Sequence, residues 1–151
     1  MKAFSHILVP TDGTPLSLKA AKEAATLARE LDAKVTAVYV TPPWVPPMAD
    51  ESAVIADYTW SEQAYVDAQA KRAASALSKV EKALADEKVA CEKVHAKGEQ
   101  PWETIIKTAS SHKCDLIVMA SHGRRGLGAL ILGSETTKVL THSKTPVLVC
   151  R

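Results

Sequence analysis

The residues best suited to chemistry lie in a glycine-rich stretch near the end of the chain. A short apolar run is followed by three glycines, and a Gly-Ser pair then precedes a helical pattern. These residues are Leu116 to Ala120, Gly123, Gly126, Gly128 and Gly133-Ser134. Glycine lets a ligand approach the main chain closely, and the first amides of a helix have no partner within it. A strand, a glycine loop and a helix N-terminus in this order are typical of an anion site, usually for phosphate.

The alternative interpretation is that the glycines form only a flexible surface loop. The apolar residues between Gly123 and Gly133 favour a packed segment instead. They are Leu127, Ala129, Leu130, Ile131 and Leu132. We therefore expect a structured loop in which a side chain at Gly133 would occupy the space of a phosphate.

Other chemistries have weaker support in the sequence. The five histidines include no i, i+4 pair and have no cysteine at ligand spacing, so a metal site is not expected. No Ser-His-acid set and no Gly-Lys-Ser/Thr phosphate loop is present, which argues against efficient phosphoryl transfer. Slow hydrolysis of a bound nucleotide stays open.

Composition sets the broad class. The 151 residues suit one domain over 1–151, and a net charge of +2 is too small for a dedicated nucleic-acid binder. Three separated cysteines, Cys91, Cys114 and Cys150, are expected as free thiols in the core of a protein from a reducing compartment. No apolar run is long enough for a signal peptide or a membrane span, so we expect a cytoplasmic protein.

Apolar runs and helical patterns alternate along the chain. Thr14 is expected as the N-cap of the first helix, with Pro15 at its first position. Strands are predicted at 6–10, 35–40, 89–96, 116–120 and 146–150, and helices at 15–31, 60–86, from 101 and at 134–143.

Strict alternation of strands and helices requires parallel pairing through right-handed crossovers. The sequence therefore predicts an α/β fold, a doubly wound five-stranded parallel sheet with helices on both faces. Ligands of such sheets bind beyond the carboxyl ends of the strands. The segments at this edge are Pro10 to Thr14, Val40 to Pro43 and Ala120 to Ser134.

Four segments give the chain a family resemblance along nearly its whole length. They are His6-Ile-Leu-Val-Pro-Thr-Asp12, Asp115-Leu-Ile-Val-Met-Ala-Ser-His-Gly123, Leu132-Gly-Ser134 and Thr145-Pro-Val-Leu-Val149. With these segments the chain resembles the universal stress protein family. The nucleotide-binding branch of that family has a glycine, two residues, a second glycine, nine residues and then Gly-Ser or Gly-Thr. Gly123, Arg124 to Leu132 and Gly133-Ser134 match this pattern, whereas the first glycine position is Ala120.

The resemblance implies strand order 3-2-1-4-5 and a bound adenine nucleotide, ATP or else AMP or ADP, with any Mg²⁺ held mainly by its phosphates. Thr11 and Asp12 would meet the ribose and adenine, the main chain of Val40 the adenine edge, and Gly123, Gly133 and Ser134 the phosphates. Met119 and Ala120 would line the base or sugar. The complete implied set is Pro10, Thr11, Asp12, Val40, Met119, Ala120, His122, Gly123, Arg124, Gly133, Ser134, Glu135 and Thr136.

Several of these residues also have a purely structural interpretation. Asp12 suits a turn or a helix cap, and Ser134 suits the cap of the last helix while still serving a phosphate. Arg124 and Arg125 fit either solvated loop charges or a partner of phosphate.

The resemblance also implies a homodimer that pairs through the last strand, at Val147, Leu148 and Val149. We expect a binding or regulatory module that holds ATP and acts in the stress response. The alternatives are a slow ATPase and a nucleotide-free dimeric interaction protein, the latter suggested by Ala120.

Overall fold

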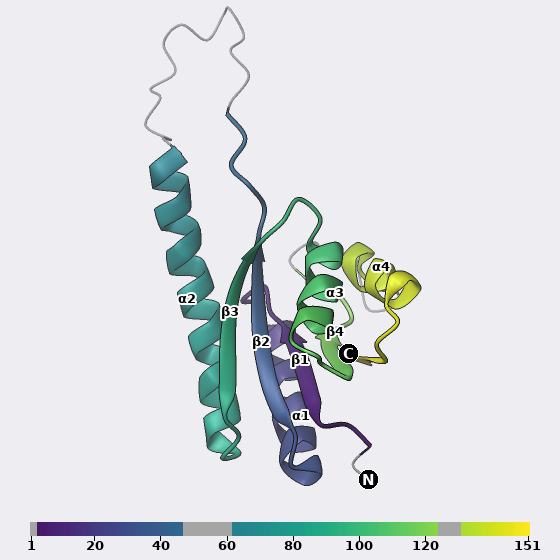
Figure 1. The fold of residues 1–151 in the computed structure, drawn as a ribbon. Coiled ribbons are helices and arrows are strands. Elements are labelled where there is room, and N and C mark those ends of the chain that lie inside the picture. Colours follow the sequence, from purple (N-terminus) through teal and green to yellow (C-terminus); the bar gives the residue numbers. More distant parts are fainter. Residues whose placement is uncertain (1–2, 47–61, 124–130) are drawn as a thin grey trace, which may run out of the picture.

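Helices cover both faces of a parallel sheet in the computed structural model, which describes residues 3–46, 62–123 and 131–151 (Figure 1). The five strands are ordered β3-β2-β1-β4-β5, so the predicted fold and strand order are confirmed. Their bounds are β1 His6–Pro10, β2 Lys34–Thr41, β3 Cys91–Lys97, β4 Leu116–Ala120 and β5 Val147–Cys150, and the helices are α1 Pro15–Leu31, α2 Glu62–Asp86, α3 Pro101–Ser111 and α4 Ser134–His142.

Two apolar cores lie on opposite faces of the sheet. The core against α1 and α2 includes the buried alanines of α1, whose small side chains let that helix lie close to the strands. The core against α3 and α4 contains Leu8, Val38 and Ile117 from the three central strands. Strands β1 and β4 are buried almost throughout because helices cover both of their faces.

Helix α1 begins and ends at residues with capping geometry. Thr14 is its N-cap and Pro15 its first residue, as predicted. Asp32 ends the helix with a φ of 50°, and its amide donates to carbonyls of the last turn. A residue in the left-handed region commonly ends a helix in this way.

Strand β3 begins at Cys91, so the predicted start at Val89 was wrong. The amide of Val89 donates to the carbonyl of Leu84, which ties Val89 to the end of α2. Lys88 has a φ of 59°, a left-handed turn that directs the chain away from the helix. The strand is at the sheet edge, as predicted.

The opposite edge of the sheet is β5, which begins one residue later than predicted. Pro146 has no N–H to donate, but its carbonyl accepts a hydrogen bond from Ile117. Leu148 is 45% exposed on this edge strand. The last helix ends at His142, with Ser143 as its C-cap, one residue earlier than predicted. Within the described residues, no helix combines the length and apolar character that crossing a bilayer requires.

Candidate functional site

Three strand ends meet at the upper edge of the sheet in Figure 1, where the parallel strands finish. The amide of Thr11 donates to Val38 as β1 ends, and the amide of Ser121 donates to Cys150 as β4 ends. Thr41 ends β2 alongside them. The topology therefore brings together the β1–α1 turn, the end of β2 and the start of the β4–α4 connection.

The β1–α1 turn is held by its own polar groups. The hydroxyl of Thr11 accepts from the amide of Gly13 at 3.2 Å and lies 3.1 Å from the hydroxyl of Ser17. Asp12 Oδ1 accepts from both the amide and the hydroxyl of Thr14, at 3.0 and 2.6 Å. Gly13 has a φ of 83°, a backbone conformation that is unfavourable for residues with a side chain. Both Thr11 and Asp12 therefore have a structural role in this turn, as the alternative interpretation of Asp12 expected.

Gly123 brings the β4–α4 connection against this turn. A Cβ atom at position 123 would overlap Oδ2 of Asp12. The absence of a side chain at Gly123 therefore lets the carboxyl group of Asp12 approach the main chain that follows β4. Residues 11–13 and 121–123, which are distant in sequence, therefore lie against each other.

Gly133 makes a second close approach, with a different reason from the one predicted. A Cβ atom there would lie 3.0 Å from Cα of His122 and 3.4 Å from the carbonyl oxygen of Ser121. The amide of Gly133 donates to that carbonyl at 2.7 Å. The space beside Gly133 is thus filled by the protein's own main chain, which gives this glycine a structural reason. The expectation that a side chain there would displace a phosphate stays a prediction.

The first turn of α4 has main-chain donors available. Gly133 is the N-cap and has no side chain to cap the helix, so the interpretation of Ser134 as the cap was wrong. Ser134 is instead the first helical residue. Within 3–46, 62–123 and 131–151, the amides of Ser134, Glu135 and Thr136 have no hydrogen-bond partner. Free amides at a helix N-terminus attract anions, and the helix dipole adds to that attraction.

Side chains in the first turn of α4 are nevertheless well anchored. The buried hydroxyl of Thr136 donates to the carbonyl of Ala120 at 2.9 Å. The carboxylate of Glu135 accepts from the amide of Trp102 at 2.8 Å and is directed at the N-terminus of α3. The helix start is therefore fixed to β4 and to α3, while its first three amides have no partner in the part of the chain that the structure describes.

The remaining predicted residues differ in what they can offer. The side chains of Pro10, Met119 and Ala120 are buried, so any ligand would meet their main chain. Val40 is partly buried near the end of β2. The imidazole Nδ1 of His122 lies 3.0 Å from the hydroxyl of Ser121.

Part of the predicted loop lies outside the described residues, including Arg124, Arg125, Leu127, Ala129 and Leu130. Of the two apolar loop residues that are described, Leu132 is partly buried and Ile131 is 66% exposed. The prediction that Ile131 would be packed was therefore wrong. No described element covers it where the chain enters α4, and single apolar residues are common on protein surfaces.

Sequence reasoning missed Ser17, Ser121 and Trp102. The hydroxyl of Ser17 lies beside that of Thr11 in the β1–α1 turn. The carbonyl of Ser121 accepts from the amide of Gly133, and the amide of Trp102 donates to the carboxylate of Glu135. Only Ser17 had a local signal, because it lies three residues after the N-cap Thr14, where a polar side chain can join the cap. The other two contacts join segments that are distant in sequence.

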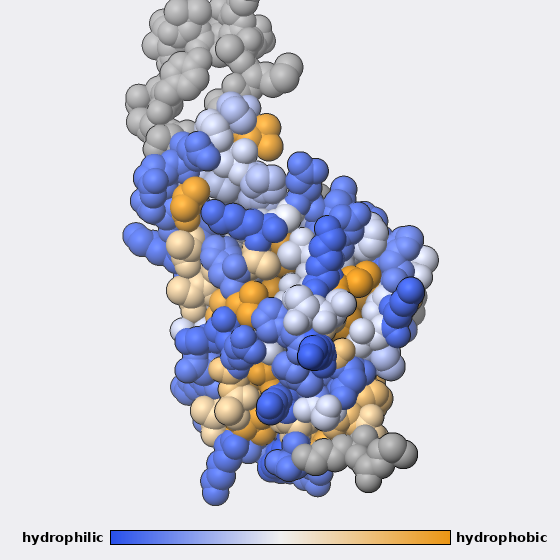
Figure 2. Space-filling view, in the orientation of Figure 1, coloured by the Kyte–Doolittle hydropathy of each residue, from blue (hydrophilic) through white to orange (hydrophobic). Residues whose placement is uncertain are grey.

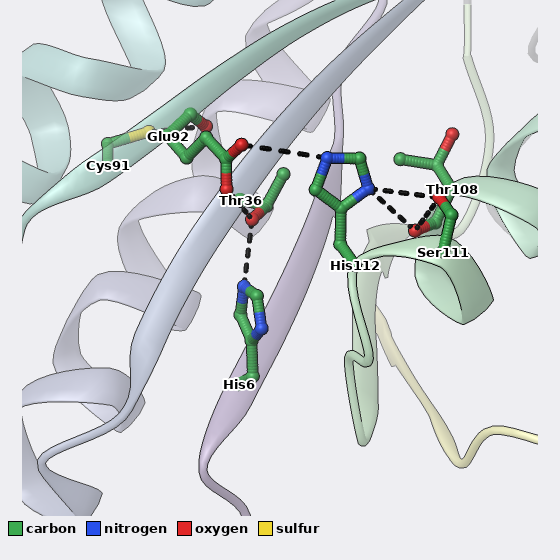
Figure 3. Close-up of polar contacts among 7 residues, drawn as sticks. All are labelled: His6, Thr36, Cys91, Glu92, Thr108, Ser111 and His112. Carbon is green, nitrogen blue, oxygen red and sulfur yellow. Dashed lines mark hydrogen bonds and ion pairs between the residues drawn. The ribbon is translucent and has the colours of Figure 1, made fainter.

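A second polar cluster lies at the opposite end of the sheet, and its side chains are paired with one another (Figure 3). The hydroxyl of Thr36 lies 2.8 Å from Nε2 of His6 and donates to Glu92 at 3.2 Å. The other oxygen of Glu92 is 3.6 Å from Nε2 of His112. Among the described residues, no group of three or more His, Cys, Asp or Glu side chains is arranged to hold a metal ion. The cluster therefore links β1, β2, β3 and the end of α3.

A surface cleft of about 470 Å³ lies along α3, and no residue of α4 is among those that line it. Its lining contains Lys97 and Lys107 but also Glu99 and Glu103, so neither sign of charge dominates. Figure 2 shows hydrophilic side chains over much of this face of the molecule. With this mixed lining, the cleft is less suited to binding an anion than the start of α4.

The cysteines are unsuited to nucleophilic chemistry. Cys114 and Cys150 are buried, as expected of core residues, whereas Cys91 is only partly buried. Burial raises the pKa of the Cys91 and Cys114 thiols to about 11 and that of Cys150 to about 12. A thiol that stays protonated at neutral pH is a poor nucleophile.

The fold and the site together define a doubly wound α/β domain with its candidate site at the carboxyl edge of the sheet. The model of the universal stress protein family matches residues 3–151, and the chain belongs to that family. A universal stress protein of Methanocaldococcus jannaschii is 34% identical over 152 residues, which cover 98% of this chain and 82% of the relative.

Two solved structures have folds similar to that of this chain. The universal stress protein UspA from Lactobacillus plantarum has a TM-score of 0.79 at 27% identity, covering 97% of each chain. A universal stress protein solved in complex with cAMP has a TM-score of 0.72 at 25% identity, covering 99% of this chain and 98% of that one. Some members of the family thus bind adenine nucleotides.

Proposed function

We propose that this protein binds an adenine nucleotide, ATP or else ADP or AMP, as a single domain over residues 1–151. The phosphates lie at the start of α4, where the amides of Ser134, Glu135 and Thr136 have no partner within the described residues. The base and sugar lie between the β1–α1 turn and the end of β2. The relative that was solved with cAMP supports this ligand class.

The single observation that carries the proposal is the difference between α4 and the other helices whose starts are described. Thr14 caps α1 with its side chain, and the carboxylate of Glu135 accepts from the first turn of α3. Helix α4 receives no such cap from the described residues. Donors left without a partner at one helix start are available to a phosphate.

The polar groups of the site favour holding a nucleotide over consuming it. Asp12 Oδ1 is engaged by Thr14, and His122 by Ser121. A phosphoryl-transfer enzyme needs a positioned base and a cation at the transferred group. We therefore propose a regulatory protein of the stress response, with slow hydrolysis as its upper limit and any Mg²⁺ held mainly by phosphate oxygens.

The exposed edge of β5 is the proposed dimer seam. Val147 and Val149 are partly buried and Leu148 is 45% exposed, on a strand whose outer edge has no partner among the described residues. Exposed apolar edge strands tend to pair with another chain. A homodimer in the cytoplasm is the assembly that we propose.

Titration calorimetry with ATP, ADP, AMP and adenosine tests the nucleotide proposal. We expect saturable binding of the phosphorylated ligands and weaker binding of adenosine, since adenosine offers nothing to the amides of α4. No heat with any of the four would leave a nucleotide-free interaction protein. Release of phosphate near 1 per second, about the low end of ordinary enzymes, would indicate an ATPase instead.

A further inference from the structure

Glu135 joins the start of α4 to the start of α3. Its Oε2 accepts a hydrogen bond from the amide of Trp102 at 2.8 Å, and its Oε1 lies 3.9 Å from the ammonium group of Lys138. Trp102 is the second residue of α3, and that helix has no side-chain cap from its own N-cap residue, Gln100. A carboxylate of α4 therefore supplies the cap that α3 lacks.

Trp102 also contacts the other end of α4. Its ring lies 4.6 Å from the imidazole of His142, centroid to centroid, with 30° between the planes. The main chain of Trp102 thus contacts the first turn of α4 and its side chain contacts the last. Helix α4 lies across the beginning of α3, as Figure 1 also shows.

The direction of the Glu135 carboxylate matters because the residue lies among the free donors. A carboxylate directed towards a phosphate at the start of α4 would repel it. Here the hydrogen bond to Trp102 holds the charge towards the N-terminus of α3, where the helix dipole favours a negative group. The amide of Glu135 has no hydrogen-bond partner among the described residues, and its side chain is directed at Trp102.

We propose that the side chain of Glu135 is a positioning group of the nucleotide site and does not itself contact the ligand. It fixes the first turn of α4 against α3, so that the amides of residues 134–136 keep one orientation. Gly133 and Thr136 fix the same turn to β4 through their bonds to Ser121 and Ala120. This inference rests on the proposed function, because the phosphate is what the fixed amides receive.

Two substitutions separate positioning from contact. Glu135→Gln keeps an oxygen that accepts from Trp102 and removes the charge, whereas Glu135→Ala removes both. We expect the affinity for ATP, measured by calorimetry, to fall about fivefold to tenfold in Glu135→Ala through the lost hydrogen bond and to stay unchanged or rise in Glu135→Gln. Glu103→Ala is the matched control, since Glu103 lies in the same turn of α3 and makes no hydrogen bond or ion pair with α4 among the described residues.

Amide hydrogen exchange in the nucleotide-free protein is the second measurement. The amide of Trp102 should exchange faster in Glu135→Ala than in the wild type, and Glu135→Gln should restore protection. Unchanged protection in Glu135→Ala would overturn the positioning role, whether or not nucleotide binds.

The binding results distinguish this inference from the function on which it rests. Equal weakening in both Glu135 variants would show that the charge contacts the ligand or its metal, and equal affinity in all forms would remove any role. A wild-type protein that binds none of the nucleotides would overturn the proposed function, and the exchange measurement would then still decide whether Glu135 fixes the turn.

Discussion

The starts of α1 and α4 lie at the same edge of the sheet and are built in opposite ways. At α1, Pro15 has no N–H, and the amides of Ser17 and Leu18 donate to the hydroxyl and carbonyl of Thr14. At α4, the N-cap is Gly133, and three successive amides have no partner within the described part of the chain. The first helix start is therefore capped by its own sequence, whereas the second has no such cap among the described residues and is the phosphate site that we propose.

The difference shows how the proposed binding site would be made without many specialised side chains. The main chain supplies the donors, and glycines let segments distant in sequence come close enough to fix them. Gly123 admits Asp12, and Gly133 admits the main chain of His122. The glycines therefore position the start of α4, and that helix would supply the donors of the proposed site.

The largest expected effect comes from closing α4 as α1 is closed. Ser134→Pro removes one amide at the first helical position, where proline is tolerated. Gly133 has φ −60° and ψ 155°, a conformation that a following proline allows. We expect calorimetry to show that the affinity for ATP is about tenfold to hundredfold weaker. This is the change expected when one hydrogen bond to a charged group is lost. Ser134→Ala keeps the amide and should bind nearly as the wild type does.

Gly133→Val tests whether the glycine positions α4. Its side chain would collide with His122 and Ser121, whose atoms lie 3.0 to 3.4 Å from the added Cβ. We expect the free energy of unfolding, from urea titration, to fall by about 1 to 3 kcal/mol, as in overpacked sites. Weakened nucleotide binding at undiminished stability would instead support the interpretation that the side chain displaces phosphate.

Asp115 provides an internal comparison, because it is an anion held by main-chain amides. Its carboxylate accepts from the amides of Ser5 and His6 at 2.8 and 2.9 Å. Burial raises the pKa of Asp115, but these hydrogen bonds outweigh it and leave the pKa below its ordinary value. Asp115→Asn should cost about 1.5 kcal/mol at pH 7.

The pH dependence of that cost has a defined sign. Because the folded pKa of Asp115 is lowered, its contribution is complete above the unfolded value of 3.8. It decreases as the pH falls below 3.8 and is lost through the folded pKa. Urea titrations of the wild type and Asp115→Asn should therefore converge in acid, and a constant difference would contradict this account.

The smallest effect is expected at the closed helix start. Thr14→Ala removes the hydroxyl that accepts from Ser17 and donates to Asp12, and a lost N-cap costs about 1 kcal/mol. Thermal unfolding should register this loss while ATP affinity changes little. A large loss of affinity would show that the two helix starts are not separate in function.

The fold was predictable because its signals are local. Alternating strand and helix patterns required a parallel sheet, and the Thr14-Pro15 pair located the start of α1. The family motifs then implied the strand order that is observed. Errors at strand ends, as at Val89, arose where a helix C-terminus took an amide that the pattern assigned to a strand.

The details of the site were less predictable because they depend on contacts between distant segments. Nothing near Gly133 indicates that its missing side chain faces His122. The sequence around Glu135 likewise gives no sign that its carboxylate caps a helix that begins at Pro101. Patterns named the residues of the candidate site, and only the tertiary structure showed which of their groups are already engaged.

The most direct test is an NMR titration of the wild-type protein with ATP, following each backbone amide. We expect the amide signals of Ser134, Glu135 and Thr136 to shift strongly on binding, as hydrogen bonds to phosphate form. The amides of Ser17 and Leu18 should shift little, because Thr14 already accepts from them. Saturable binding with no change at residues 134–136 would contradict the claim that the open start of α4 holds the phosphates.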